Sequence, residues 1–365
     1  IWDHVYKAVT DPTVTTKDGQ RYIEIDKDGQ IERLVIDGLI TRAPCAGRAT
    51  ACWKAHREED PGAPLVIKDS WQDMTHDEGE FLREATDKGV VNVARYYYHA
   101  TVQVHGEVDT RGGLDSMTTG DYQLEISSAA SLPSSKRSRS ASRNTLQTRV
   151  YRRVILRDYG RPIYEASTRP AFLAALEGCI SGHESLHRAG ILHRDIPINN
   201  LMINEDEKNP SWPAFLIDLD LAIRDGASKT DKSKGTRAFM AIGALMGEQH
   251  SFMHDLESFF WVIFWICIHY EGPSKGIVVS RLTGWNYMDA EELACLKTGV
   301  VVVHEGDFFR YMDTYFTAYY QPLIPWVNRL RQAVFPNGLR WVKEDRELYA
   351  RMKAILRGAQ EDPDM

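Results

Sequence analysis

The chain has 365 residues, of which 43% are hydrophobic and 26% charged, and its formal net charge is −7. This length suits two lobes around a cleft rather than one minimal domain. The negative charge excludes a general electrostatic attraction to nucleic acids or anionic membranes. Five cysteines without a C-x-x-C pair indicate neither a disulfide framework nor a zinc cage. We therefore expect an intracellular protein, cytoplasmic or nuclear.

The first part of the chain has the pattern of short strands followed by one short helix. β-Branched and aromatic residues recur between Asp-Gly and Pro-Gly turns, as in antiparallel sheets. A helix is predicted from Glu78 to about Asp87, because Phe81, Leu82 and Ala85 fall on one helical face. The predicted strands are Arg21–Ile25, Ile31–Ile36, Ala49–Lys54, Leu65–Lys68, Val91–Val104 and Val150–Leu156.

Residues 105–149 interrupt this pattern. The stretch from Ser127 to Ser142 is rich in serine and basic residues and has few large apolar groups, so burial cannot offset the entropy of ordering it. We expect a disordered insertion that acts as a solvated linker, a nuclear-import signal or a phosphorylatable loop. Nucleic acid is the least supported partner, because no aromatic residues alternate with the basic ones.

The chain beyond residue 156 is expected to be mainly helical. The apolar run Phe259–Ile268 would span only about 15 Å as a helix, half of a bilayer core, so we expect a buried core helix and no membrane partner. A β-rich first part and a helical second part predict a two-lobed α+β protein. The predicted helices cover roughly residues 170–190, 253–270, 289–298, 307–332 and 343–357.

Four polar residues occur in an order that suits phosphoryl transfer. His193-Arg194-Asp195 is followed by Asn200, while two apolar runs lead into Lys68 and Asp218. This reaction needs a carboxylate at the attacking hydroxyl, oxygen ligands for magnesium and a cation on the phosphates. Asp195, Asn200 with Asp218, and Lys68 supply that set. The sequence thus predicts ATP and Mg²⁺ as cofactors.

At these residues the chain resembles the eukaryotic protein kinases and, within them, the fungal-type protein kinase family. The resemblance covers roughly residues 34–300, and it implies a protein-kinase-like fold with a β-rich N-lobe and a mostly helical C-lobe. The expected parts are an N-terminal extension (1–33), the N-lobe (34–156, with the insertion at about 105–149) and the C-lobe (157–365). The closer match rests on Ile67-Lys68-Asp69-Ser70-Trp71, Gly160-Arg161-Pro162-Ile163, Leu216-Ile217-Asp218-Leu219-Asp220-Leu221-Ala222, Gly235-Thr236-Arg237-Ala238-Phe239-Met240 and His254-Asp255-Leu256-Glu257-Ser258.

The resemblance implies a role for each residue of the predicted site. Asp195, preceded by Arg194, would orient and deprotonate the substrate hydroxyl, and Asn200 with Asp218 would hold magnesium. Lys68 would contact the α and β phosphates of ATP and pair with a glutamate on the following helix.

Two glutamates are candidates for the partner of Lys68. We select Glu78, because Phe81 and Leu82 follow it at +3 and +4 and would face the core. Glu80 is the alternative.

The resemblance also implies the remaining contacts. Thr236 and its neighbours would present a protein substrate, and Asp255 would anchor the catalytic loop from the apolar helix. A turn formed by Gly47, Arg48, Ala49 and Thr50 would cover the phosphates of ATP. A hinge over Leu156–Tyr159 would bind adenine, and its expected contacts are Leu156, Asp158 and Tyr159.

Some positions depart from the kinase pattern. The phosphate turn keeps only Gly47, with Ala49 where a further glycine is usual. Pro197 stands where serine/threonine kinases usually have a lysine, and Ala241-Ile242-Gly243 replaces A-P-E, with the loss of a bracing ion pair. We predict an ATP-dependent kinase acting on a protein hydroxyl, with serine or threonine favoured. A weakly active pseudokinase or scaffold is the alternative, and a small-molecule acceptor is also left open.

A second motif overlaps the first. The string from His183 to His193 fits H-E-x-x-H-x-x-G-x-x-H, in which His183, His187 and His193 would bind zinc with Glu184 as general base. This zinc-hydrolase alternative leaves the phosphoryl-transfer residues unexplained, so we rank it below the kinase.

Overall fold

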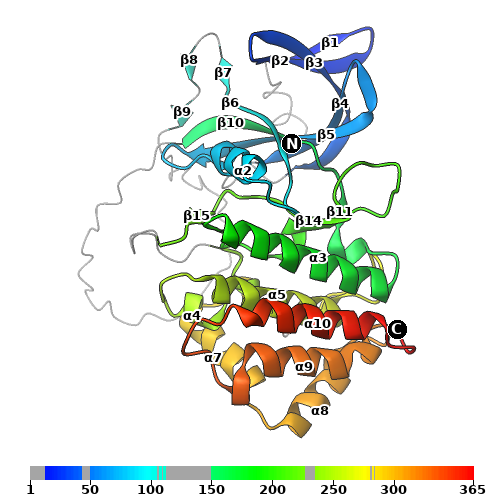
Figure 1. Ribbon diagram of the computed structural model, residues 1–365, viewed down its shortest axis with the longest axis vertical. Coiled ribbons are helices and arrows are strands. Elements are labelled where there is room, and N and C mark those ends of the chain that lie inside the picture. The colour runs from blue at the N-terminus through cyan, green and yellow to red at the C-terminus, as the bar shows by residue number, and fades with distance from the viewer. Residues whose placement is uncertain are drawn as a thin grey trace, which may run out of the picture.

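The computed structural model consists of two lobes stacked along its long axis (Figure 1). The upper lobe is built on a β-sheet and the lower lobe is mainly helical. The predicted two-lobed α+β architecture is thereby confirmed. The structure describes residues 13–42, 50–104, 107–108, 110–111, 149–226, 235–279, 282 and 284–365.

The N-lobe sheet is antiparallel, and its order follows the chain except that β10 inserts between β5 and β6. The first two hairpins turn at Asp18-Gly19 and Asp28-Gly29, where both residues have positive φ, as two-residue hairpin turns require. β7 (Gln103–Val104) pairs with β8 (Glu107–Val108), and β9 (Thr110–Arg111) extends the sheet beside β10. The main order is β1 (Val14–Lys17), β2 (Gln20–Lys27), β3 (Gln30–Arg42), β4 (Ala51–Arg57), β5 (Asp60–Asp73), β10 (Arg149–Leu156) and β6 (Tyr96–Thr101).

Two predicted features of the N-lobe differ from the structure. The boundary expected at residue 33 falls inside β3, and β1 and β2 continue the same sheet. The strand expected over Val91–Val104 begins only at Tyr96. The reason is that Asn92 has a positive φ and its carbonyl accepts a hydrogen bond from Leu216 of the C-lobe, which draws this segment away from the sheet. Residues 112–148, most of the predicted insertion, lie outside the described part.

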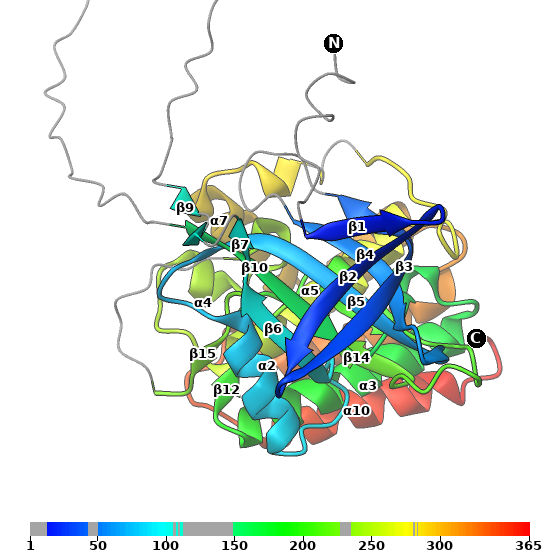
Figure 2. The ribbon, with the colours of Figure 1, turned by 90° about the horizontal axis from the view of Figure 1, so that it is seen from above.

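The one helix described in the N-lobe is α2 (Glu78–Asp87), at the predicted position. It begins there because Asp77 caps it, accepting a hydrogen bond from the Gly79 amide at 2.9 Å. Leu82 and Ala85 form its buried face, and the view from above shows the helix beside β6 (Figure 2).

The C-lobe is organised around a buried helix, α5 (Phe252–His269). Every residue of α5 except Trp265 is buried, which confirms the predicted core helix. In the described part of the chain, no helix has the length and apolar character needed to cross a membrane. The other helices are α3 (Arg169–Arg188), α4 (Ile242–Leu245), α7 (Ala290–Val301), α8 (Glu305–Tyr315), α9 (Ile324–Val334) and α10 (Glu347–Gln360), of which α10 lies along α3 (Figure 1).

The prediction of a single helix over residues 307–332 is wrong. The chain forms α8 and α9 instead, separated by a turn that contains a short 3-10 helix (Gln321–Leu323). α8 ends at Tyr315 because Phe316 adopts an extended backbone, with φ −69° and ψ 136°. The Thr317 amide bonds instead to the carbonyl of Cys267 on α5, at 2.9 Å.

Two small sheets in the C-lobe position the loops below the cleft. β13 (Leu201–Ile203) lies between β11 (Arg161–Pro162) and β14 (Ala214–Leu216), and β12 (Ile191–Leu192) pairs with β15 (Ile223–Arg224). The loop from residue 193 to 200 therefore joins β12 to β13, and the loop from 217 to 222 joins β14 to β15. Their strand pairings keep the two loops side by side.

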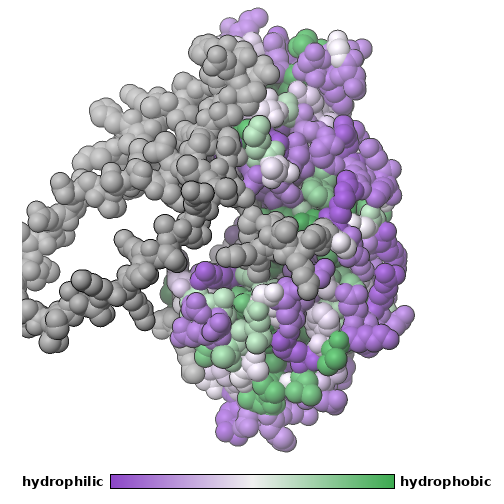
Figure 3. All heavy atoms as spheres, turned by 90° about the vertical axis from the view of Figure 1, so that its left-hand side faces the viewer, coloured by the Kyte–Doolittle hydropathy of each residue, from purple (hydrophilic) through white to green (hydrophobic). Residues whose placement is uncertain are grey.

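On the side shown in Figure 3, green hydrophobic atoms gather low on the molecule, on the helical lobe. Large hydrophobic side chains exposed on this lobe include Met246, Leu296, Val302 and Leu339.

Candidate active site

The loop containing Asp195 is anchored to the core helix α5 by one carboxylate. Asp255 is 1% exposed, and its Oδ2 accepts hydrogen bonds from the amides of His193 and Arg194, each at 3.2 Å. The rings of His183 and His250 donate to the two oxygens of Asp255, each at 2.8 Å. Burial alone would raise the pKa of Asp255, but the two histidines hold it well below its usual range. The carboxylate therefore stays ionised, and Arg194 is held at a positive φ of 71°.

His193 links this loop to the loop of Asp218. Burial lowers the pKa of His193, so the ring is neutral near pH 7. Its Nε2 donates to the carbonyl of Ile217 at 3.0 Å, and its Nδ1 accepts from the Asp195 amide at 3.4 Å. The Asn200 amide group donates to the Asp195 carbonyl at 3.2 Å. The two loops are thus joined through backbone atoms next to the predicted catalytic residues.

Asp195 itself lies beside the segment expected to present a substrate. Its Oδ1 accepts a hydrogen bond from the Thr236 amide at 2.8 Å. Gly235 approaches closely as well, since its Cβ position would lie 3.2 Å from the Arg194 carbonyl. The carboxylate is therefore fixed between its own loop and the segment around Thr236.

Lys68 connects the two lobes at the centre of the site. Its ammonium group lies 2.8 Å from both carboxylate oxygens of Glu78 and 2.8 Å from Oδ1 of Asp218. Glu80, the alternative partner, instead pairs with Arg83 and His99. The structure thus places the Lys68 pair at Glu78.

Acidic side chains surround the Lys68 ammonium group. Burial alone would lower its pKa, but Asp218 and Glu78 raise it above its usual value, so the ammonium group stays charged. Burial raises the pKa of Glu78, and Asp218 and Asp220 add to this effect. The Lys68 ammonium group therefore faces the carboxyl groups of Glu78, Asp218 and Asp220. Carboxylate oxygens are also among the ligands that a divalent cation prefers.

The two predicted magnesium ligands lie at the same end of one strand pair. Leu201 pairs with Leu216, so Asn200 and Asp218 both emerge where β13 and β14 meet the cleft. The Ile217 amide also donates to the Asn200 carbonyl, at 3.1 Å. The side chain of Asp218 is 28% exposed. An amide and a carboxylate oxygen fit magnesium, which prefers oxygen ligands.

The predicted hinge is braced by its own side chains. Asp158 is buried, and its carboxylate accepts hydrogen bonds from the Arg95 amide at 2.7 Å, from the Arg95 guanidinium at 2.6 Å and from the Trp212 amide at 3.1 Å. The Tyr159 amide donates to Ser211 at 2.8 Å. These contacts are all with protein, and binding of adenine by Leu156, Asp158 and Tyr159 stays a prediction.

The predicted phosphate turn falls mostly outside the described residues, which include only Thr50 of Gly47, Arg48, Ala49 and Thr50. Thr50 is partly buried and directly precedes β4. The role predicted for this turn therefore stays a prediction.

The histidines of the overlapping zinc motif contact different partners and do not converge on a common point. His183 uses one ring nitrogen for Asp255 and the other for the Tyr349 hydroxyl, each at 2.8 Å. His187 stacks on Phe252, and Glu184 pairs with Lys353 at 2.5 Å. Across the described ranges, no group of three or more His, Cys, Asp and Glu side chains is arranged to hold a metal ion. The geometry therefore gives the zinc-hydrolase alternative no support.

Two buried side chains hold the segment Ala241-Ile242-Gly243, which replaces A-P-E. The sequence did not predict these contacts. The Lys297 ammonium group donates to the Met240 carbonyl at 2.6 Å, and Oε1 of Glu257 accepts from the Ile242 amide at 2.7 Å. Both side chains are buried, which lowers the pKa of Lys297 and raises that of Glu257. The sequence could have revealed the role of Glu257, because it is a charged residue within an apolar helix. Nothing in the sequence of α7 sets Lys297 apart in this way. The segment lacks the usual ion pair but is held through its backbone.

The Lys68–Glu78 pair of the β-rich lobe contacts Asp218, on a loop of the helical lobe. This arrangement defines the class of the protein kinases. The family model described as fungal protein kinase matches residues 9–267, which is more than half of the chain. The chain belongs to the fungal protein kinase family.

Similar proteins are kinases as well. The chain is 35% identical over 95 residues to a probable serine/threonine-protein kinase of Dictyostelium discoideum, and 37% identical over 78 residues to rhodopsin kinase of Homo sapiens. These matches cover 26% and 21% of this chain but only 6% and 13% of those proteins. The solved structure of vaccinia related kinase 3 superposes with a TM-score of 0.57 and 12% identity, covering 98% of this chain and 93% of that one. At this identity the likeness shows the fold alone.

Proposed function

We propose that this protein transfers the γ-phosphate of MgATP to a serine or threonine hydroxyl of a protein substrate. One observation carries the proposal. Lys68 lies 2.8 Å from both Glu78 and Asp218, so a strand, a helix and a C-lobe loop bring together the groups that phosphoryl transfer requires.

The residues act by positioning and by neutralising charge. The Lys68 ammonium group binds phosphate oxygens of ATP, and Glu78 orients it. Asp195 accepts a hydrogen bond from the substrate hydroxyl and takes its proton as the phosphate is transferred. Asn200 and Asp218 would hold magnesium, which when bound neutralises charge on the phosphates. Pro197 supplies no cation beside the transferring phosphate, so we expect slow turnover.

The acceptor and the location are further parts of the proposal. A serine or threonine acceptor is supported by the match to the Dictyostelium kinase described as serine/threonine-specific. An intracellular location, cytoplasmic or nuclear, is supported by the absence of a C-x-x-C pair and of a disulfide among the described cysteines.

The proposal is tested by transfer of labelled phosphate from MgATP to the protein itself and to a generic protein substrate. We expect transfer to serine or threonine that stops when EDTA removes magnesium and resumes when magnesium is added back. A well-folded protein that binds ATP, by thermal shift, without transferring phosphate would instead be the pseudokinase.

The partner of Lys68 can be tested with two matched variants. Glu78→Gln removes the charge that orients Lys68, and we expect kcat/KM for ATP to fall about 10- to 100-fold, as for the loss of one charge-assisted hydrogen bond. Glu292→Gln makes the same chemical change at an exposed glutamate in the first turn of α7 and should leave kcat/KM within about twofold. Equal losses in both variants would contradict the assignment.

A further inference from the structure

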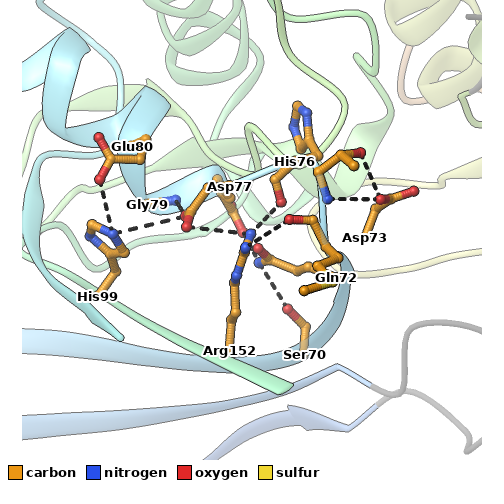
Figure 4. Close-up of polar contacts among 12 residues, drawn as sticks. Ser70, Gln72, Asp73, His76, Asp77, Gly79, Glu80, His99 and Arg152 are labelled. Carbon is orange, nitrogen blue, oxygen red and sulfur yellow. Dashed lines mark hydrogen bonds and ion pairs between the residues drawn. The ribbon is translucent and has the colours of Figure 1, made fainter. Parts of the chain in front are cut away.

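The position of Glu78 depends on the turn that leads into α2. Glu78 is the first residue of this helix, so the buried helical face formed by Leu82 and Ala85 begins a full turn further on. The end of β5 and the turn up to Asp77 determine where the Glu78 carboxylate lies. Figure 4 shows this turn against the neighbouring strands β10 and β6.

Arg152, on β10, holds this turn to the sheet. The side chain is buried, and its guanidinium donates to the carbonyls of His76 and, at 3.3 Å, of Met74. The same group lies 3.4 Å from the carboxylate of Asp77, which caps α2. A planar guanidinium presents its donors in a fixed fork that reaches several acceptors, whereas the lysine ammonium group is a compact point charge. Arg152 thus contacts three of the four residues from Met74 to Asp77.

His99, on β6, sets how closely the helix approaches the sheet. Its ring lies against Gly79, where a Cβ atom would overlap the Cβ, Cγ and Cδ2 atoms of His99. Its Nε2 lies 3.3 Å from Glu80, and its Nδ1 shares a hydrogen bond with the Tyr96 hydroxyl at 3.0 Å. His99 is therefore fixed from both sides, and only glycine fits at position 79.

A third contact connects this region directly to the site. The Gln72 side chain donates to Oε2 of Glu78 and to the hydroxyl of Ser70, each at 3.1 Å. Gln72 and Ser70 belong to β5, the strand of Lys68, and Ser70 is opposite Arg152 in the strand register. The strand of Lys68 is thus joined to Glu78 by Gln72, while Arg152 of the adjacent strand holds the turn that directly precedes Glu78.

We propose that Arg152 and His99 are positioning residues for phosphate transfer: they fix the first turn of α2 and thereby hold Glu78 against Lys68. The inference rests on the proposed function, because Glu78 matters for catalysis only if Lys68 binds ATP. Arg152 acts by attaching the turn to β10, and His99 acts by setting the distance between α2 and β6.

The contact between Gly79 and His99 is tested by a pair of complementary substitutions. Gly79→Ala should push the first turn off β6 and lower kcat/KM for ATP by roughly tenfold or more. Adding His99→Ala makes room for the new methyl group and should restore most of this loss. Gly299→Ala is the matched control, since this helical glycine on α7 has no atom within 4 Å of its Cβ position.

Arg152 is tested by removing its charge and by changing its shape. Arg152→Gln and Arg152→Lys should both lower kcat/KM for ATP by roughly tenfold, because neither keeps the fork that binds the turn. Arg310→Gln, at an exposed arginine on α8, should have no effect.

A second measurement separates this inference from the proposed function. Hydrogen exchange of the amides from Asp77 to Leu82 should be faster in Gly79→Ala and Arg152→Gln, and slow again in the Gly79→Ala/His99→Ala protein. If the wild-type protein transfers no phosphate, the proposed function fails. Hydrogen exchange of these amides would still show whether Arg152 and His99 fix the first turn of α2. Wild-type exchange and activity in both single variants, or a double variant no better than Gly79→Ala, would overturn the inference. If Gly79→Ala does not fold, the Arg152 variants decide.

Discussion

Replacing Asp195 with asparagine is expected to reduce phosphate transfer by roughly 10²- to 10⁴-fold, the usual contribution of a general base. The amide cannot take the proton of the substrate hydroxyl. The fold should be retained, because the asparagine oxygen can still accept the hydrogen bond that the Thr236 amide gives to Asp195. The measurement is labelled phosphate transfer with saturating MgATP, together with the midpoint of thermal unfolding and the affinity for ATP.

The control is Asp313→Asn, the same change at an exposed aspartate on α8. It should leave transfer unchanged. If Asp195→Asn transfers phosphate at the wild-type rate, Asp195 is not the catalytic base. If the variant also loses affinity for ATP or unfolds at a much lower temperature, the loss of transfer cannot be assigned to the proton.

Replacing Asp255 with alanine is expected to have the largest effect on stability. It would leave the buried amides of His193 and Arg194 and the rings of His183 and His250 without their acceptor. Removing one side of such a buried charged network costs about 3–5 kcal/mol, a large part of the stability of a typical domain. The free energy of unfolding, measured with denaturant, should fall by this amount, and transfer should be lost with it. Asp313→Ala is the matched control and should change the unfolding free energy by less than about 0.5 kcal/mol.

The same carboxylate predicts a dependence of stability on pH. The pKa of Asp255 is far lower in the folded than in the unfolded protein, where it is about 3.9. The folded state therefore binds fewer protons, so the stabilisation is complete above this value and is lost as the pH falls below it. Asp255→Asn should show a smaller loss of stability between about pH 4 and pH 2 than the wild type. The same slope in both proteins would show that Asp255 is not responsible.

Local patterns were sufficient to predict much of the framework. The helix from Glu78 to Asp87 was placed correctly from its periodic apolar face. The buried run Phe259–Ile268 was assigned to the core by its length. Predictions failed where a distant partner interrupted the pattern, at Asn92, which bonds to Leu216, and at Thr317, which bonds to Cys267 just after α8 ends.

The sequence by itself determined the protein class and the order of its chemical groups. Asp195 and Asn200 share one short loop, and Lys68 and Asp218 each end an apolar run, so their spacing is visible without coordinates.

Only the tertiary structure decided how the remaining groups are used. It selected Glu78 over Glu80, separated the histidines of the zinc motif, and brought Glu257 and Lys297 to one segment. The physical reason is that each of these contacts joins elements whose relative orientation is set by packing between lobes, sheets and helices. Spacing along the chain carries no information about such distances.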